Sequence, residues 1–211
     1  MNEQRNTNDI MEEKQRAQEE AINCIRENPD AIDWKTISAE AILPEDFMRE
    51  FKDRVDWFEI SRYQVLSEDF IREFKDRVDW LRITCTQDLS EGFMREFQDR
   101  VHFGSIPATR ELSEGFIREF QNRVNWGRIS ANQTLSEDFI REFKDRVCWD
   151  AIVESQKLSE DFINEFKDMV PWDLVEFDDV RACQDWPESL IGEFEDMARD
   201  IEEQGWDRGP R

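Results

Sequence analysis

Large apolar residues recur along this chain in columns that are 23 residues apart. Within each copy a leucine is followed after four residues by a phenylalanine, and a second phenylalanine and a valine follow at further steps of four. An aromatic residue and an isoleucine or valine complete most copies. The two most regular columns are Leu43, Leu66, Leu89, Leu112, Leu135 and Leu158, and Phe47, Phe70, Phe93, Phe116, Phe139 and Phe162. A constant period of this size is typical of stacked repeat architectures.

The spacing inside one copy, LSEDFIREFKDRVDW at residues 66–80, predicts an α-helix in its first half. Phe70, Phe74 and Val78 stand at i, i+4 and i+8, which places them on one stripe of a helix. Ser67 precedes the stripe as an N-cap, and the two acidic residues after it fall where the helix dipole favours anions. We expect this helix to have about three turns.

A second, shorter helix or 3₁₀ segment is expected after a turn. Asp79 is placed to cap it, and Trp80 and Ile83 stand three residues apart, as on one helical face. The alternative is a strand over residues 80–84, which would make each repeat an α/β unit. Because a spacing of three fits a helix better than a period of two, we predict an all-α solenoid of short helix–turn–short-helix repeats.

Degenerate copies at both ends determine the expected domain organisation. We expect residues 1–20 to form a polar segment that is a loose helix or disordered, residues 21–42 a degenerate capping repeat, residues 43–180 six full repeats, residues 181–204 an acidic capping helix, and residues 205–211 a frayed tail. The capping repeats would cover the apolar ends of the stack, which solenoids require for solubility.

The third full repeat departs from the pattern of the others. Gly104 and Pro107 fall in its second half, where both residue types disfavour a helix. We therefore expect its second helix to be distorted. His102 replaces the aspartate that caps the second helix in other copies, and the sequence offers it no catalytic partner. We therefore interpret this histidine as a helix cap or a surface residue rather than as a general base.

The repeat LSEDFIREFKDRVDWxxISxxQ resembles helical repeat arrays that giant DNA viruses and some phages encode. The resemblance covers roughly residues 31–177, and its columns are specific. It implies a viral origin and a helical repeat scaffold. It implies no general activity and no site residues, so function has to be inferred from the residues themselves.

Charge is the outlying feature of the composition. The chain has 51 acidic and 28 basic residues, a net charge of −23 and a sequence pI near 4.4. Such a surface repels nucleic acid and anionic membranes and attracts basic protein surfaces. We therefore expect a protein partner with a basic surface, no direct contact with nucleic acid and no membrane association.

Cysteine and histidine usage argues against a zinc site or a disulfide framework. The four cysteines are far apart in sequence and the chain has one histidine. No apolar leader and no long apolar run occurs in the sequence. We expect a reduced, soluble, intracellular protein, and the viral resemblance places it in the cytoplasm of an infected cell.

Two repeated features could be mistaken for a nucleic-acid site. The aromatic columns could stack on single-stranded bases, but they occupy the stripe that neighbouring repeats must bury. A ladder of arginines could bind phosphates, but each arginine has acids four residues away, such as Glu45 and Asp53 on either side of Arg49, and Glu50 before Arg54. The ladder consists of Arg49, Arg72, Arg95, Arg118 and Arg141. We interpret the rings as core and the ladder as a self-neutralised surface.

No catalytic or metal motif singles out a reactive group. The chain has no glycine-rich phosphate loop, no HExxH and no nucleophile elbow. Residues 176–185 gather acids but lack the glycine and spacing of a calcium loop. Carboxylates are so numerous that no catalytic pair stands out. We predict no catalytic residue, no metal and no cofactor.

The strongest candidate site is the acidic end of the chain. Residues 150–203 hold 18 acidic and 4 basic residues, and Asn164 and Met169 replace the two arginines of the repeat there. The candidate partner-binding residues are Asp173, Glu176, Asp178, Asp179, Asp185, Glu188, Glu193, Glu195, Asp196, Asp200, Glu202 and Glu203. A solubilising cap and a docking surface for a basic partner explain this charge equally well.

Three functional hypotheses follow from these features. The leading one is a non-catalytic viral module that binds a basic protein surface. In its more specific form, the module mimics nucleic acid and inhibits a host defence or nucleic-acid enzyme. The second is a structural or scaffolding protein of viral assembly, which would self-associate through apolar positions. The third is an enzyme, for which a buried acid with a perturbed pKa in a deep pocket would be required.

Overall fold

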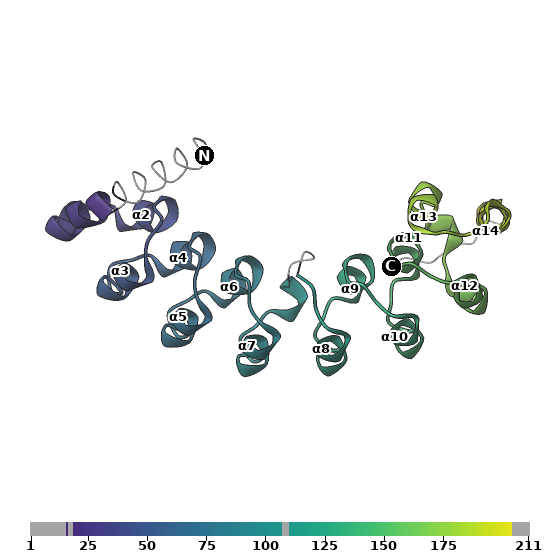
Figure 1. Ribbon diagram of the computed structural model, residues 1–211, viewed down its shortest axis with the longest axis horizontal. Coiled ribbons are helices and arrows are strands. Elements are labelled where there is room, and N and C mark those ends of the chain that lie inside the picture. Colours follow the sequence, from purple (N-terminus) through teal and green to yellow (C-terminus); the bar gives the residue numbers. More distant parts are fainter. Residues whose placement is uncertain (1–15, 17–18, 107–109, 204–211) are drawn as a thin grey trace, which may run out of the picture. The chain divides into compact units, whose positions relative to one another are not determined.

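The computed structural model of the chain describes residue 16 and residues 19–106 and 110–203. It divides into two compact units, unit 1 up to His102 and unit 2 from Phe103 onward. The described residues form helices and connecting turns, and no strand occurs among them. The prediction of an all-α repeat solenoid is confirmed (Figure 1).

Unit 1 alternates two kinds of helix, which we call the first and second helix of each repeat. The first helices α3, α5 and α7 form one row and the second helices α2, α4 and α6 form another (Figure 1). Adjacent second helices pack directly on one another. The elements are a helical stretch over residues 19–27, then η1 (Pro29–Ala31), α2 (Trp34–Glu40), α3 (Glu45–Glu50), α4 (Trp57–Tyr63), α5 (Glu68–Glu73), α6 (Trp80–Thr86) and α7 (Glu91–Glu96).

Unit 2 continues the same alternation and adds a long helix. Its second helices α9, α11 and α13 pack in order, and the last helix, α14, packs on η4. The elements are η2 (Phe103–Ser105), α8 (Glu114–Glu119), α9 (Trp126–Asn132), α10 (Glu137–Glu142), α11 (Trp149–Ser155), α12 (Glu160–Phe166), η3 (Lys167–Met169), η4 (Trp172–Leu174), α13 (Phe177–Cys183) and α14 (Glu188–Glu203).

The expected domain boundaries stay predictions, although the helices show how they relate to the elements. Helix α13 spans the expected boundary between residues 180 and 181, and α14 forms most of the expected capping helix. Most of residues 1–20 and all of residues 205–211 lie outside the described part. As expected, the second element of the third full repeat is distorted: its described residues form the 3₁₀ turn η2, where the second repeat has the helix α6.

The helix lengths differ from the expectation. The first helix α5 has 6 residues rather than three turns, and the second helix α6, expected to be shorter, has 7. The α5 helix ends at Phe74, where the backbone leaves helical geometry at φ −108° and ψ 26°. A tight turn follows, in which Val78 N still donates to Phe74 O at 3.1 Å. This bond returns Val78 to the buried stripe although the residue lies outside the helix.

The predicted caps are confirmed, and the strand alternative is wrong. Ser67 Oγ accepts from Phe70 N at 3.1 Å, and Asp79 Oδ1 accepts from Arg82 N at 2.9 Å. Each bond satisfies one of the N–H groups that the first turn of a helix leaves without a partner. The segment 80–84, for which a strand was the alternative, lies inside α6.

The core consists of aromatic rings shared between neighbouring repeats. The Trp57 ring lies 6.1 Å from Phe70 and 4.7 Å from Phe74 of the next repeat, measured between centroids. The polar edge of the tryptophan is satisfied, since Trp57 Nε1 donates to Lys52 O at 2.9 Å. Phe70 is fully buried. The interpretation of these rings as core packing is confirmed.

Candidate docking site on the second helices

A buried glutamine at the end of the second helices α4, α6, α9, α11 and α13 fixes each of them on the preceding repeat. Gln64 Oε1 accepts from Leu43 N at 3.0 Å, while Gln64 Nε2 donates to Ser38 O and Ala41 O at 2.9 and 2.7 Å. The same position is occupied by Gln64, Gln87, Gln133, Gln156 and Gln184. These glutamines are not among the residues predicted from the sequence, although their regular recurrence is visible there. This glutamine column determines which residues of each second helix face outward.

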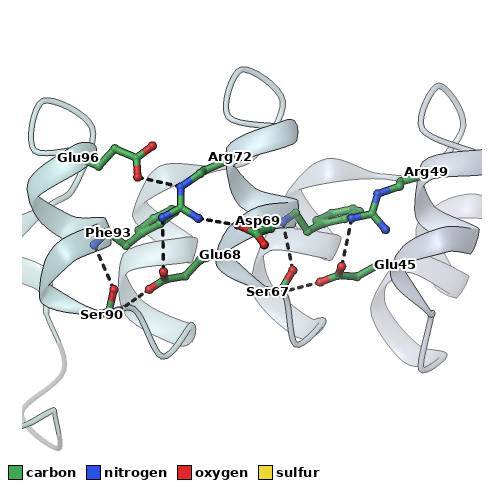
Figure 2. A network of polar contacts seen from close by, with 10 residues as sticks. Glu45, Arg49, Ser67, Glu68, Asp69, Arg72, Ser90, Phe93 and Glu96 are labelled. Atoms are coloured by element: carbon green, nitrogen blue, oxygen red, sulfur yellow. Dashed lines mark hydrogen bonds and ion pairs between the residues drawn. The ribbon is translucent and has the colours of Figure 1, made fainter.

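The first helices carry a ladder of ion pairs between repeats, shown for α5 and its neighbours in Figure 2. Arg72 Nε donates to Glu96 Oε2 of the next repeat at 2.8 Å, and Arg72 Nη1 donates to Asp69 Oδ1 at 2.7 Å. The Arg72 guanidinium also lies over the ring of Phe93, 5.1 Å from its centroid. The hydrogen bond to Glu96 is the main cause that raises the pKa of Arg72.

Most of these pairs are not the ones that helical spacing predicted. The pair of Glu45 with Arg49 is confirmed at 3.3 Å. The expected pairs of Asp53 with Arg49 and of Glu50 with Arg54 are wrong. Instead Arg77 Nη2 binds Asp53 Oδ1 at 2.7 Å, and Glu50 and Arg54 bind residues of the repeat before them. Stacking brings residues 24 apart in sequence closer than residues four apart, so the ladder is neutralised across repeats.

The ladder loses its arginines near the end of unit 2. Arg141 still binds Glu165 and Asp138, each at 3.1 Å. One repeat later Asn164 donates its side-chain amide to the backbone oxygen of Glu160 at 2.9 Å. Neither Glu160 nor Asp161 forms an ion pair with any residue that the structure describes. The substitution of this one arginine therefore leaves carboxylates without the cations that their equivalents bind elsewhere.

The candidate acids of the sequence analysis fall into two groups. Five are paired within the chain: Asp185 with Lys157, Glu193 with Lys167, Glu188 and Glu195 with Arg181, and Asp196 with Arg199. Glu176, Asp178, Asp179, Asp200 and Glu203 are exposed and form no ion pair within the described ranges. Asp173 is half-buried, and the side chain of Glu202 lies outside the described part. The twelve predicted partner-binding residues thus do not form one surface.

Helices α11 and α13 bring carboxylates together on one surface. We define the acidic face as Asp150, Glu154, Glu176, Asp178 and Asp179. Glu154 Oε1 accepts from Glu176 N at 2.7 Å. Burial raises the pKa of Glu154, and the charges of Asp150, Asp179 and Glu176 raise it further. Glu154 thus lies close enough to Asp150, Asp179 and Glu176 for their charges to act on it.

Two members of the acidic face, Asp150 and Glu154, were missing from the sequence-derived set. They stand four residues apart on α11, so they share one side of that helix. Counted back from the buried glutamine that ends each second helix, Asp178 of α13 occupies the same position as Asp150 of α11. The glutamine column would therefore have revealed Asp150, but not Glu154, whose counterpart on α13 is Ala182.

Asp150 also holds the proton on Cys148. Cys148 Sγ donates to Asp150 Oδ1 at 2.9 Å, and this bond, partial burial and the carboxylate charge raise the pKa of Cys148 to about 11. Because the thiolate is the reactive form, we expect alkylation of Cys148 by iodoacetamide to accelerate about tenfold per pH unit between roughly pH 8 and 10. Asp150→Asn should raise the rate at pH 8 by about tenfold. Peptide mapping by mass spectrometry measures both rates, and equal rates would contradict the assignment.

Other chemistry finds little support among the described residues. No group of three or more His, Cys, Asp or Glu side chains there could hold a metal ion, and no described helix is long and apolar enough to cross a membrane. His102 N donates to Thr84 Oγ1 at 3.2 Å, just as Asp79 N donates to Ser61 Oγ at 2.9 Å. His102 therefore occupies the backbone position of a cap aspartate. That the chain is not an enzyme stays a prediction.

The acidic face is the surface that distinguishes the end of this repeat array from its beginning. It is built from two adjacent second helices that buried glutamines hold in place, and the carboxylates on it repel one another. Comparison with known proteins supplies no further assignment: the chain matches no protein-family model, no curated protein and no solved structure.

Proposed function

We propose that this protein is a non-catalytic interaction module whose acidic face binds a basic surface of a partner protein. The supporting observation is that none of the five carboxylates of this face forms an ion pair with a residue that the structure describes. On the first helices the arginines meet carboxylates of their own and of neighbouring repeats, as Arg72 does with Asp69 and Glu96. On α11 and α13 the carboxylates are exposed or half-buried, and those of Asp150, Asp179 and Glu176 repel that of Glu154.

Repulsion between these carboxylates favours binding of a cationic partner. Each like charge that the folded chain holds nearby raises the free energy of the unbound face, and a basic surface that neutralises the charges relieves this repulsion. The net charge of −23 adds long-range attraction, which accelerates encounters at low salt. Specificity would come from the fixed spacing of carboxylates on two packed helices.

The partner in this proposal is a nucleic-acid-binding protein. A row of carboxylates presented by rigid helices offers a basic cleft the same charge pattern as a phosphate backbone. The chain would then occupy the cleft in place of nucleic acid and inhibit the partner. The resemblance to viral repeat arrays is the reason to place this activity in an infected cell, against a host enzyme.

Charge-neutralising variants test the proposal. We expect Asp150→Asn, Glu154→Gln, Asp178→Asn and Asp179→Asn together to reduce capture of a basic partner from host lysate by about tenfold or more. Capture should fall as NaCl rises from about 50 to 200 mM, and duplex DNA should compete with the protein for the partner. Quantitative mass spectrometry of the captured proteins measures the change.

A matched control separates this site from net charge. Glu27→Gln, Glu40→Gln, Asp88→Asn and Asp99→Asn remove four exposed charges in unit 1 and leave the acidic face intact. This control should retain most of the captured partner. Equal losses in the two variants would mean that total charge alone decides binding, and unchanged capture by the first variant would exclude the acidic face.

A further inference from the structure

The exposed apolar side chains of the described chain are concentrated in unit 1. On the second helices α4 and α6, Phe58 is 40% exposed, Tyr63 51% and Leu81 39%. Ile42 and Val65, in the turns after second helices, are exposed more fully still. Phe58 and Leu81 occupy the same outward position on successive second helices. Large exposed apolar side chains beside one another on two packed helices are typical of a protein-binding surface.

Two arginines lie among these apolar residues and differ from the ladder arginines. Neither Arg62 nor Arg82 forms an ion pair with a residue in the part of the chain that the structure describes. The Arg82 guanidinium carbon lies 5.0 Å from the ring centroid of Phe58, and that of Arg62 lies 4.8 Å from the ring centroid of Tyr63. The buried Nε atom of Arg82 has no hydrogen-bond partner.

The aromatic rings hold these guanidinium groups in place, and the N–H groups of the guanidinium remain able to bind carboxylates. A guanidinium that is already oriented loses less side-chain freedom when it forms a two-pronged contact with a carboxylate. Helices α4 and α6 contain one acidic residue, Glu59, against these two arginines, within a chain whose net charge is −23. We define the arginine–aromatic face as Phe58, Arg62, Tyr63, Leu81 and Arg82.

The arginine–aromatic face and the acidic face use corresponding positions of the repeat. The outward position that holds Phe58 and Leu81 in unit 1 holds Asp150 and Asp178 in unit 2. The arginine–aromatic face thus offers guanidinium and apolar groups, and the acidic face offers carboxylates.

We propose that the arginine–aromatic face of one copy binds the acidic face of a second copy. This inference rests on the proposed function, because it names a partner for the same acidic face. Since the two surfaces differ, the contact is heterologous, and the assembly keeps one unused arginine–aromatic face at one end and one unused acidic face at the other. Copies would therefore add head to tail.

Salt dependence distinguishes this contact from binding to a strongly basic partner. Two copies of a chain with a charge of −23 repel at long range, and moderate salt screens that repulsion. High salt then also weakens the short-range pairs of arginine with carboxylate. Association of copies should pass through a maximum as NaCl rises from about 20 to 500 mM, whereas capture of a basic partner falls steadily.

Sedimentation velocity on the full chain tests the proposal with two variants. Arg62→Ala with Arg82→Ala removes both guanidinium groups of the arginine–aromatic face. The four substitutions at Asp150, Glu154, Asp178 and Asp179 remove most of the charge of the acidic face. Wild type should show an average mass that rises with concentration between about 5 and 200 µM. Each variant alone should stay monomeric. An equimolar mixture should form a 1:1 dimer, in which the acidic face of one variant binds the arginine–aromatic face of the other. This dimer should not grow, because no intact face is left to bind a further copy.

Lys52→Ala with Lys75→Ala is the matched control, because it removes two exposed positive charges outside the arginine–aromatic face. This control should associate like wild type. A wild-type chain that stays monomeric throughout these conditions, or a mixture that forms no dimer although wild type associates, would overturn the inference. Partner capture by Arg62→Ala with Arg82→Ala is measured in parallel. If the arginine variant still captures the partner but does not self-associate, the proposed function is unaffected. Capture by the four-acid variant tests the proposed function separately.

Discussion

Replacing Phe139 by alanine is expected to lower the free energy of unfolding by about 4 kcal/mol. Phe139 is fully buried, and its ring centroid lies 6.3 Å from Trp126 and 4.7 Å from Phe143. The Arg118 guanidinium lies over the same ring at 4.8 Å. Alanine therefore leaves a cavity at the contact between two repeats, where both repeats lose packing.

Urea unfolding followed by circular dichroism measures this loss. Phe139→Leu is the control, because it keeps most of the apolar volume and should cost roughly 1–2 kcal/mol. An alanine variant that loses less than leucine, or a loss near zero, would contradict the role of this ring as the shared core. Tryptophan fluorescence should change in the same transition, since Trp126 packs directly on Phe139.

Replacing Gln156 by leucine is the second large effect, with an expected loss of about 3 kcal/mol. Gln156 Oε1 accepts from Leu135 N at 3.0 Å, and Gln156 Nε2 donates to Gln133 O at 2.7 Å and Ser130 O at 3.1 Å. Leucine fills the space but leaves these buried backbone groups without partners. An unpaired buried group costs more than the hydrogen bond contributes when it is present.

Gln156→Glu provides a pH-dependent test of the same network. Its oxygen can still accept from Leu135 N, but the ionised side chain offers no proton to the two backbone oxygens. Burial raises the pKa of such a carboxyl above its value in the unfolded chain, so its destabilisation is largest at high pH and decreases as the pH falls through the folded pKa. Urea unfolding at several pH values measures this, relative to wild type. A difference from wild type that does not vary with pH would contradict the assigned bonds.

Local sequence was enough for the class of fold and for the helix starts. The steps of four between Phe70, Phe74 and Val78 report which residues are buried, and they report it correctly. They do not report which backbone bonds bring a residue into the core. Val78 reaches the core through a turn after the helix, so the helix is shorter than the stripe that predicted it.

Contacts between repeats account for the other differences. Helical spacing correctly predicted the pair of Glu45 with Arg49, but the pairs of Arg49 with Glu73 and of Arg77 with Asp53 depend on how closely the next repeat stacks. The sequence contains the residues of these pairs, and stacking selects the partners.

For the candidate site, the sequence alone determined where arginines stop and where acids gather. Replacement of the ladder arginine by Asn164 and the 18 acids of residues 150–203 are visible without a structure. Only the tertiary structure decided which acids act together, because five of them are neutralised by neighbouring cations while Asp150, Glu176 and Asp179 act on Glu154 across two packed helices. Charge is a property of residues, but an interaction between charges depends on distance, and in this chain distance is determined by stacking.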